Sequence, residues 1–283
     1  MNTLLVFGYG YTASVLGRQL LAKGWRVIGT TLSPEKLADM QRSGVEPILW
    51  PENDISAALK VATHILVSAA PTKDGDPVLR ELGGALCENA KRVEWLGYLS
   101  TTAVYGDRNG DWVDENSELR PTTERGKWRV AAEQAWREAG LPTHIFRLAG
   151  IYGPNRGPFA KVRAGTARRI IKEGQVFSRT HVEDIAQVLY ASMRQPNPDA
   201  VYNVCDNDPA PPQDVIAEAA RMLGLPIPKE IPFETAEMTP MARSFYAESK
   251  KVSNRRIIEE LGVKLKYPDY RSGLSALLAK ESP

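Results

Sequence analysis

Short apolar runs alternate with helix-like segments over the first two thirds of the chain, and this alternation restricts the fold more than any other feature. Strands that alternate with helices pair in parallel through right-handed crossovers. The alternation therefore predicts an α/β fold with a doubly wound parallel sheet. Runs with the length and composition of strands cover 3–7, 26–30, 46–50, 64–68, 96–100 and 144–148. Helical spacing covers 13–23, 34–43, 77–93 and 125–139.

The pattern changes after residue 152. A loop rich in Gly and Pro covers 153–158, a helix is predicted over 182–193, and a further strand over 200–204. The proline-spaced stretch 226–240 resembles a linker or an irregular lobe, and 253–261 is amphipathic. We expect a main α/β domain formed by 1–152 with 181–206, and a smaller C-terminal lobe formed by 153–180 with 207–283.

Composition excludes several classes of protein. Charged residues make up 25% and apolar residues 43%, and the formal net charge is only +2, as in an ordinary globular protein. The sequence has no long basic stripe of the kind that binds nucleic acid, so we expect no nucleic-acid partner. No run approaches the roughly 18 apolar residues of a membrane span, and the N-terminus lacks signal-peptide features. We expect a cytoplasmic protein with no membrane partner.

The two cysteines, Cys87 and Cys205, are far apart and have no histidine or cysteine neighbours at metal-ligand spacing. Such thiols usually behave as small buried hydrophobic groups in a reducing compartment. We therefore expect both to be buried, with neither a disulfide nor a metal site.

A glycine turn follows the first predicted strand directly, with the pattern Gly8-x-Gly10-x-x-Ala13 before a helix. In this context the first glycine permits a tight turn, the second lets the backbone approach a pyrophosphate, and the small third residue packs strand against helix. The helix N-terminus attracts the anion. We expect Gly8, Gly10, Tyr11, Thr12 and Ala13 to bind a nicotinamide dinucleotide in a Rossmann fold. The alternative is a glycine-rich crossover without a ligand.

The end of the second strand bears on the choice between NAD and NADP. NAD-specific sites usually place a carboxylate there for the ribose diol, whereas this chain has Thr30, Thr31, Leu32 and Ser33. These hydroxyl groups, with Lys36, could surround a 2′-phosphate at a helix start. The residues therefore slightly favour NADP. Alternatively, they only cap a surface helix.

Four sequence motifs occur along the chain. They are the glycine turn, Ser100-Thr101-Thr102-Ala103-Val104-Tyr105-Gly106, Arg147-Leu148-Ala149-Gly150-Ile151-Tyr152-Gly153-Pro154 and Thr180-His181-Val182-Glu183-Asp184-Ile185-Ala186. Together they resemble the extended short-chain dehydrogenase/reductase superfamily, in particular its NAD-dependent epimerase/dehydratase group, and the resemblance covers nearly the whole chain. It implies that Ser68, Ala69 and Ala70 lie beside the cofactor and that Thr101 matches the catalytic Ser/Thr. It also implies a substrate-binding C-terminal lobe and a homodimer.

The chain departs from the family at its central Tyr-x-x-x-Lys motif, where Arg125 and Arg129 occupy the two positions. Arginine stays protonated at any working pH, so this pair cannot transfer a proton. Residues four apart share one helix face. Directed at a cleft with Thr101, the arginines would hold a carboxylate or phosphate, or polarise a carbonyl. The alternative is a solvated face with ordinary salt bridges.

Three further groups of charged or polar residues are weaker candidates for a functional site. His181, Glu183 and Asp184 could suggest a metal, but the resemblance implies a hydrogen-bonded junction between lobe and sheet instead. One basic run could close over an anionic substrate or form a solvated helix face; it contains Arg243, Lys250, Lys251, Arg255 and Arg256. Another polar set lies where relatives meet their substrate; it contains Asn155, Arg156, Arg163, Arg168 and Arg169.

Three functions remain open on the sequence. The first is an NAD(P)-dependent oxidoreductase or epimerase-like enzyme acting on a small, anionic or nucleotide-linked substrate, with Thr101 bonding the reacting oxygen. The second is a noncatalytic NAD(P)-binding module that passes a conformational signal to a partner. The third is an enzyme of another class that binds a nucleotide as substrate, because fold alone does not determine function.

Overall fold

The computed structural model describes residues 1–281, apart from the side chains of Met241 and Glu281. Its centre is a seven-stranded sheet in the order β11-β7-β5-β4-β1-β2-β3, and every neighbouring pair is parallel. All six predicted strands and the further strand at 200–204 belong to it, so the α/β prediction is confirmed. The strands are β1 (Thr3–Phe7), β2 (Arg26–Thr31), β3 (Glu46–Leu49), β4 (His64–Val67), β5 (Trp95–Thr101), β7 (Thr143–Leu148) and β11 (Val201–Val204).

The strand order reverses direction at β1, which pairs with β2 on one side and β4 on the other, so that Val6 lies opposite both Gly29 and Leu66. In open parallel sheets, ligands bind outside the carboxyl ends of the strands at such a switch point. The glycine turn follows β1 at this position.

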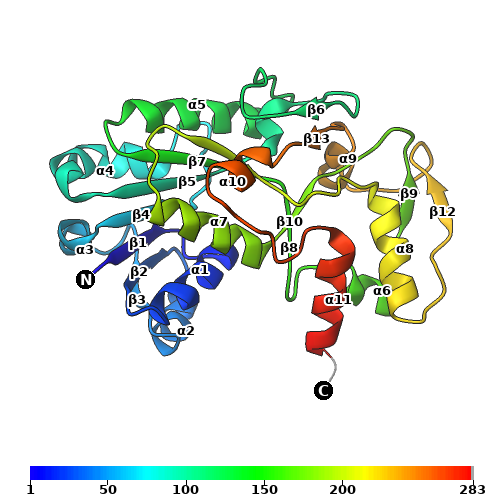
Figure 1. The fold of residues 1–283 in the computed structure, drawn as a ribbon, viewed down its shortest axis with the longest axis horizontal. Helices are drawn as coiled ribbons and strands as arrows, with labels where there is room; N and C mark the ends of the chain where they lie inside the picture. The colour runs from blue at the N-terminus through cyan, green and yellow to red at the C-terminus, as the bar shows by residue number, and fades with distance from the viewer. Residues whose placement is uncertain (282–283) are drawn as a thin grey trace.

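Helices cover both faces of the sheet (Figure 1). One layer contains α1 (Tyr11–Leu21), α2 (Leu37–Arg42), α7 (Val182–Arg194) and α10 (Arg255–Glu259); the other contains α3 (Ser56–Val61), α4 (Pro77–Glu88) and α5 (Glu124–Glu138). Helix α3 is absent from the sequence prediction because six residues are too few to establish a helical period.

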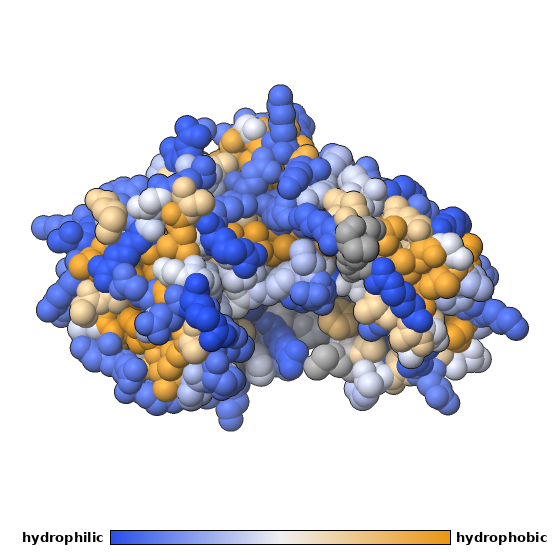
Figure 2. All heavy atoms as spheres, turned by 90° about the horizontal axis from the view of Figure 1, so that it is seen from below, coloured by the Kyte–Doolittle hydropathy of each residue, from blue (hydrophilic) through white to orange (hydrophobic). Residues whose placement is uncertain are grey.

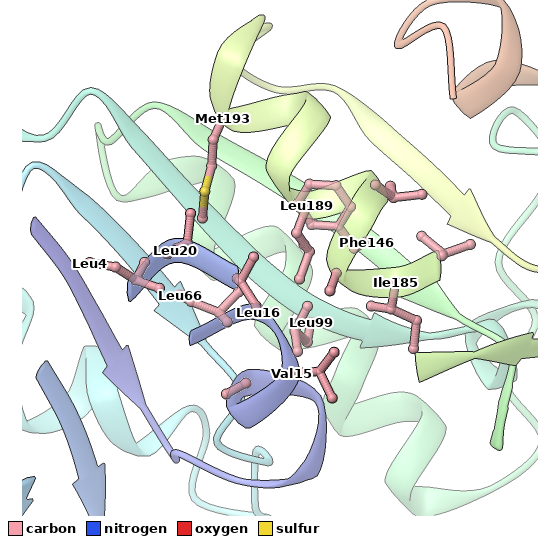
Figure 3. Packing of buried hydrophobic residues seen from close by; sticks show 14 of the residues in the cluster. Leu4, Val15, Leu16, Leu20, Leu66, Leu99, Phe146, Ile185, Leu189 and Met193 are labelled. Carbon is pink, nitrogen blue, oxygen red and sulfur yellow. The ribbon is translucent and has the colours of Figure 1, made fainter. Parts of the chain in front are cut away.

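Alternating strand residues divide between the two layers. Figure 3 shows the apolar cluster between the sheet and one helix layer, where Leu16 and Leu20 of α1 and Leu189 of α7 pack on the sheet. Leu4 and Leu66 contribute from β1 and β4 to the same cluster. Their neighbours Leu5 and Ile65 face the opposite cluster, as the two-residue period of a strand requires. The sheet is therefore buried on both faces.

A smaller lobe lies beyond the carboxyl ends of the strands (Figure 1). Its own apolar cluster includes Phe159, Val162, Ala219 and Leu274. Its elements are β8 (Gly150–Tyr152), α6 (Phe159–Arg163), β9 (Arg169–Ile171), β10 (Arg179–His181), α8 (Pro212–Met222), β12 (Glu230–Pro232), α9 (Pro240–Phe245) and α11 (Tyr270–Glu281). The stretch expected to be irregular thus contains β12, which pairs with β9.

The chain returns from the lobe to the sheet near its end. Ile257, Leu261 and Val263 pack in the same cluster as α1 and α7, although the sequence analysis assigns 207–283 to the lobe. Before this segment, β13 (Lys251–Val252) pairs with β6 (Trp112–Val113). The predicted domain boundaries otherwise stay a prediction.

The expected junction between lobe and sheet is confirmed at the start of α7. Asp184 accepts backbone hydrogen bonds from Lys266 at 2.7 Å and Tyr267 at 3.1 Å. Glu183 accepts from the Lys266 ammonium, the Tyr267 hydroxyl and the Lys280 ammonium. These two acidic residues therefore fasten the C-terminal segment to the sheet.

Cysteine burial was only partly predicted correctly. Cys205 is buried and its thiol donates to the carbonyl oxygen of Val252, but Cys87 is exposed. The error arises because Cys87 lies on the outer face of α4, next to the buried Leu86.

Within residues 1–281, no helix combines the length and apolarity that crossing a membrane requires. On the face that Figure 2 shows, polar and charged side chains separate the apolar patches.

Candidate active site

The glycine turn has the geometry of a ligand cradle. Gly8 has a positive φ of 83°, and a Cβ atom there would lie 3.2 Å from the backbone nitrogen of Ala69. The turn therefore packs directly on the segment after β4. At Gly10 the nearest such neighbour is 3.9 Å away, so the space above that residue is open. Only the first glycine is required by the fold itself.

The helix that follows the turn has no side-chain cap. Asp76, Thr123 and His181 cap α4, α5 and α7 with their side chains. Helix α1 begins after Gly10, which has no side chain to offer. The first N–H groups of a helix need an outside partner and attract anions. A dinucleotide pyrophosphate fits this cradle.

The two threonines at the end of β2 hold the backbone. Thr30 Oγ1 accepts from the backbone N–H of Gly8 at 3.0 Å, and Thr31 Oγ1 accepts from that of Ser33 at 3.1 Å. Ser33 precedes a single turn of 3-10 helix at Pro34–Lys36, and Leu32 is 73% exposed. Thr30 and Thr31 therefore shape the loop expected to meet the adenosine half of the cofactor.

Tyr11 joins the glycine turn to the lobe side of the molecule. Its hydroxyl donates to the carbonyl oxygen of Pro154 at 2.9 Å, and the Arg156 guanidinium lies 5.7 Å from its ring centroid. The neighbouring Ala13 is fully buried in the core under the turn. The start of α1 is thus held against the loop that follows β8.

A cleft of about 1030 Å³ opens beyond the carboxyl ends of β4, β5 and β7. It is large enough for a small-molecule ligand. Thr12 and Ser68 border it on the glycine-turn side, and Thr101, Arg125 and Arg129 border it further along. Ala69 and Ala70 continue from Ser68 along the loop after β4. The three predicted catalytic residues therefore share one cavity.

Thr101 ends β5 with its hydroxyl partly fixed. Its Oγ1 accepts from the backbone N–H of Ala103 at 3.2 Å, at the start of a short 3-10 helix, Thr102–Tyr105. A hydroxyl that accepts one bond still has its own hydrogen to donate. Thr101 can therefore donate a hydrogen bond to an oxygen atom in the cleft.

The two arginines of α5 that line the cleft are held differently. Arg129 Nη1 donates to the carbonyl oxygen of Leu99 at 2.7 Å and to the Tyr98 hydroxyl at 3.2 Å. Burial strongly raises the pKa of Tyr98, so this hydroxyl stays protonated. Arg125 is exposed, and no hydrogen bond or ion pair joins it to another described residue. Arg125 is the more available of the two for an anion.

A buried polar network supports the wall behind the cleft. Glu133 and Arg147 form an ion pair at 2.8 Å, with both side chains 4% exposed. Ser100 donates to Glu133, and Arg147 donates to the Tyr105 hydroxyl. Burial raises the pKa of Tyr105 to about 12, so it too stays protonated. This network fixes the ends of β5 and β7, and with them Thr101.

Arg179 and Glu248 were absent from the sequence prediction of the site, and Lys250 appeared in it only as a member of the basic run that could close over an anionic substrate. Arg179 on β10 donates to the carbonyl oxygens of Phe177 and Ala210, and burial lowers its pKa. Glu248 and Lys250 line the cleft as an ion pair at 2.6 Å. The only signal was the basic run containing Lys250, of which Lys250 alone borders the cleft. Their long sequence separation from β5 hides this proximity.

Several of the other basic residues form ion pairs outside the cleft. Arg255 and Arg256 pair with Glu259 and Glu260 along α10, and Arg169 pairs with Glu230. Arg156 is the member of the second polar set that lines the cleft. In the part of the chain that the structure describes, no cluster of three His, Cys, Asp or Glu side chains could hold a metal ion.

The chain is similar to known proteins over nearly its whole length. A solved structure of a functionally unknown conserved protein from Silicibacter pomeroyi superposes with a TM-score of 0.96, at 60% identity over 99% of both chains. Protein YeeZ of Escherichia coli is 28% identical over 285 residues, covering 95% of this chain and 97% of YeeZ. UDP-glucuronic acid 4-epimerase from Bacillus cereus, in complex with NAD, shares the fold with a TM-score of 0.77 at 18% identity, over 98% and 96% of the two chains.

The sequence model of the RmlD substrate binding domain matches residues 1–280. The chain belongs to this family, within the extended short-chain dehydrogenase/reductase superfamily.

Proposed function

We propose that the protein binds a nicotinamide dinucleotide along the glycine turn and acts on a small anionic or nucleotide-linked substrate, as an oxidoreductase or epimerase-like enzyme. The observation that carries this proposal is the cleft that begins at Thr12 and Ser68 beside the glycine turn and contains Thr101, Arg125 and Arg129. The NAD in the Bacillus cereus epimerase supports the cofactor class.

Each residue has a distinct role in this proposal. The first N–H groups of α1 hold the pyrophosphate, and Gly10 leaves room for it. Bound there, the nicotinamide would supply or accept a hydride. Thr101 donates a hydrogen bond to the reacting oxygen, and the Arg125 and Arg129 guanidinium groups hold negative charge. The fixed positive charge of the arginines makes an anionic substrate the better fit.

The choice between NAD and NADP depends on the residues at the end of β2. Without a carboxylate at the end of β2, NADP is favoured slightly over NAD. The cytoplasmic location and the homodimer stay predictions.

The binding half of the proposal is tested by titrating the protein with NADH and NADPH and following nicotinamide fluorescence. Gly10→Val should abolish binding, because the side chain would fill the space above the turn. Gly84→Val, at a glycine with open space on α4, is the matched control. Failure of both dinucleotides to bind at millimolar concentration would refute the proposal.

The catalytic half is tested by dinucleotide oxidation against a panel of substrates. The panel contains aldehydes and ketones that carry carboxylate or phosphate groups, together with 4-keto nucleotide sugars. Arg125→Gln should raise KM for the anionic substrate about tenfold or more while leaving the dinucleotide Kd unchanged. Dinucleotide binding without turnover of any panel member would favour the noncatalytic module instead.

A further inference from the structure

Lys250 is a buried cation in the wall of the cleft. Its side chain is only 10% exposed, and its Nζ donates to the carbonyl oxygen of Gly106 at 2.8 Å and to Glu248 Oε2 at 2.6 Å. An ammonium group has three hydrogens. Two have partners within residues 1–281, and the third is left for a ligand in the cleft that this residue lines.

The chain brings Lys250 to the site from far along the sequence. Gly106 ends the short helix that follows Thr101. Thr122, which donates to Glu248, is next to the Thr123 cap of α5, the helix that carries Arg125. The contacts of Nζ therefore hold it between the segment after Thr101 and the start of α5, where the family motif would place its tyrosine and lysine.

Hydrogen bonds of Ser249 hold the backbone next to Lys250. Ser249 receives a backbone hydrogen bond from Arg108 and one from Gly110, and its own N–H donates to Asp107. Its hydroxyl accepts from Val176 N–H and donates to Gly174. The residue next to Lys250 is thus bonded to both the main domain and the lobe, which places the Lys250 backbone at the wall of the cleft.

Few other described side chains in the cleft could give up a proton. Arginine does not release one, and serine and threonine hydroxyls donate hydrogen bonds without ionising near neutral pH. Glu124 and Glu248 accept bonds from Lys127 and Lys250 as carboxylates. The Tyr152 hydroxyl is buried away from solvent with no hydrogen-bond partner among the described residues, and burial drives its pKa far upward. Lysine, in contrast, is an established acid and base in enzymes.

We propose that Lys250 is the catalytic residue that protonates the substrate oxygen, in place of the missing tyrosine. This inference rests on the proposed function. A reduced nicotinamide bound at the glycine turn would supply the hydride for the carbonyl carbon, and Nζ of Lys250 gives a proton to the carbonyl oxygen. The N–H electron pair stays on the nitrogen, which regains a proton from solvent. Thr101 donates a hydrogen bond to the same oxygen.

The test compares Lys250→Met with Lys250→Arg on a substrate that the wild-type protein reduces. Both variants should lower kcat about 100-fold or more, with KM and the dinucleotide Kd within threefold. Arginine keeps the charge but cannot release the proton, so a merely electrostatic or structural role would be rescued by it. Lys251→Met is the matched control, because the adjacent Lys251 does not line the cleft.

A second variant covers the chance that the loss of Lys250 disturbs folding. Lys250→Met leaves Glu248 buried without its partner, so the double variant Lys250→Met with Glu248→Gln removes that orphaned charge. A folded double variant with the same 100-fold loss supports the proposal. Recovery of kcat in the double variant overturns it.

A spectroscopic measurement needs no turnover. In protein labelled with ¹³C at lysine Cε, the Lys250 resonance is identified by its absence from Lys250→Arg. It should shift when a substrate that the wild-type protein reduces is added together with the oxidised dinucleotide, which blocks turnover, whereas the Lys251 resonance should not. A Lys250 resonance indifferent to this substrate overturns the proposal. Absence of wild-type turnover with all panel substrates refutes the catalytic function itself, whereas turnover unaffected by either Lys250 variant refutes only this inference.

Discussion

The hydroxyl oxygen of Thr30 accepts a hydrogen bond from the backbone N–H of Gly8 at 3.0 Å, which ties the glycine turn to the end of β2. Thr30 is 2% exposed. The next backbone N–H, that of Tyr9, donates to the Thr30 carbonyl oxygen. Thr30 thus holds two successive N–H groups of the turn, one through its hydroxyl oxygen and one through its carbonyl oxygen.

We expect Thr30→Val to weaken NADH and NADPH binding by the same factor. The variant leaves the Gly8 N–H unpaired, which should cost about 1–3 kcal/mol of unfolding free energy. Thr30→Ser keeps the acceptor and should restore both properties. Chemical denaturation and fluorescence titration measure the two effects. A selective loss of NADPH would instead indicate that Thr30 contacts the 2′-phosphate.

Gly8→Ala should destabilise the protein more than Gly24→Ala does. Both glycines have positive φ, 83° and 76°, but a Cβ atom at Gly24 has no neighbour within 4 Å. The Gly24 variant therefore measures the conformational cost alone, about 1–2 kcal/mol. The Gly8 variant adds the close approach to Ala69. Equal losses of unfolding free energy in the two variants, measured with denaturant, would show that the loop after β4 moves to accommodate the added methyl group.

Glu133→Gln should lower the free energy of unfolding by about 3 kcal/mol, because it leaves the Arg147 charge buried without its partner. Glu138→Gln, on the same helix and exposed, is the control and should change stability by less than about 0.5 kcal/mol. Replacing Glu133 and Arg147 together by Gln and Met should cost less than Glu133→Gln alone. A single-variant loss below that of the control would contradict this account of the network.

Glu183 should make the junction between lobe and sheet sensitive to acid. Burial alone would raise its pKa, but hydrogen bonds from Lys266, Lys280 and Tyr267 outweigh burial and lower the pKa to about 2. Because the folded-state pKa lies below the unfolded value of 4.5, the contribution is complete above pH 4.5 and is lost as the pH falls through 2.

Glu183→Gln should therefore reduce stability by about 2 kcal/mol at pH 7, after allowance for partial exposure. The difference from wild type should shrink between pH 4.5 and 2. Thermal unfolding across this range measures it. A difference independent of pH would mean that the carboxylate charge is not what holds the junction.

Much of the fold could be predicted from local pattern. The six apolar runs and the helix-like segments between them contain enough periodicity to place the strands of the main sheet. The three-residue strands of the lobe could not be found this way. At that length, β9 and β12 contain too few residues for a period, and they exist because they pair with each other.

Only part of the site could be predicted from the local sequence pattern. Thr101 and the arginines of α5 stand next to recognisable motifs, and these residues line one cleft. Lys250 belongs to no motif, and its basic run left open whether it closes over an anionic substrate or forms a solvated helix face. Its burial depends on Gly106 and Glu248, which enclose it only after the lobe has packed on the main domain.

The sequence by itself determined the parallel sheet, the glycine turn at the end of β1 and the loss of the Tyr-x-x-x-Lys motif, because these depend on residues close together in the chain. Tertiary structure alone decided what surrounds the turn and the cleft. Thr30 bonds Gly8 across a strand pair, and Lys250 reaches Gly106 over 144 positions. Such contacts depend on packing between distant segments, which no local pattern encodes.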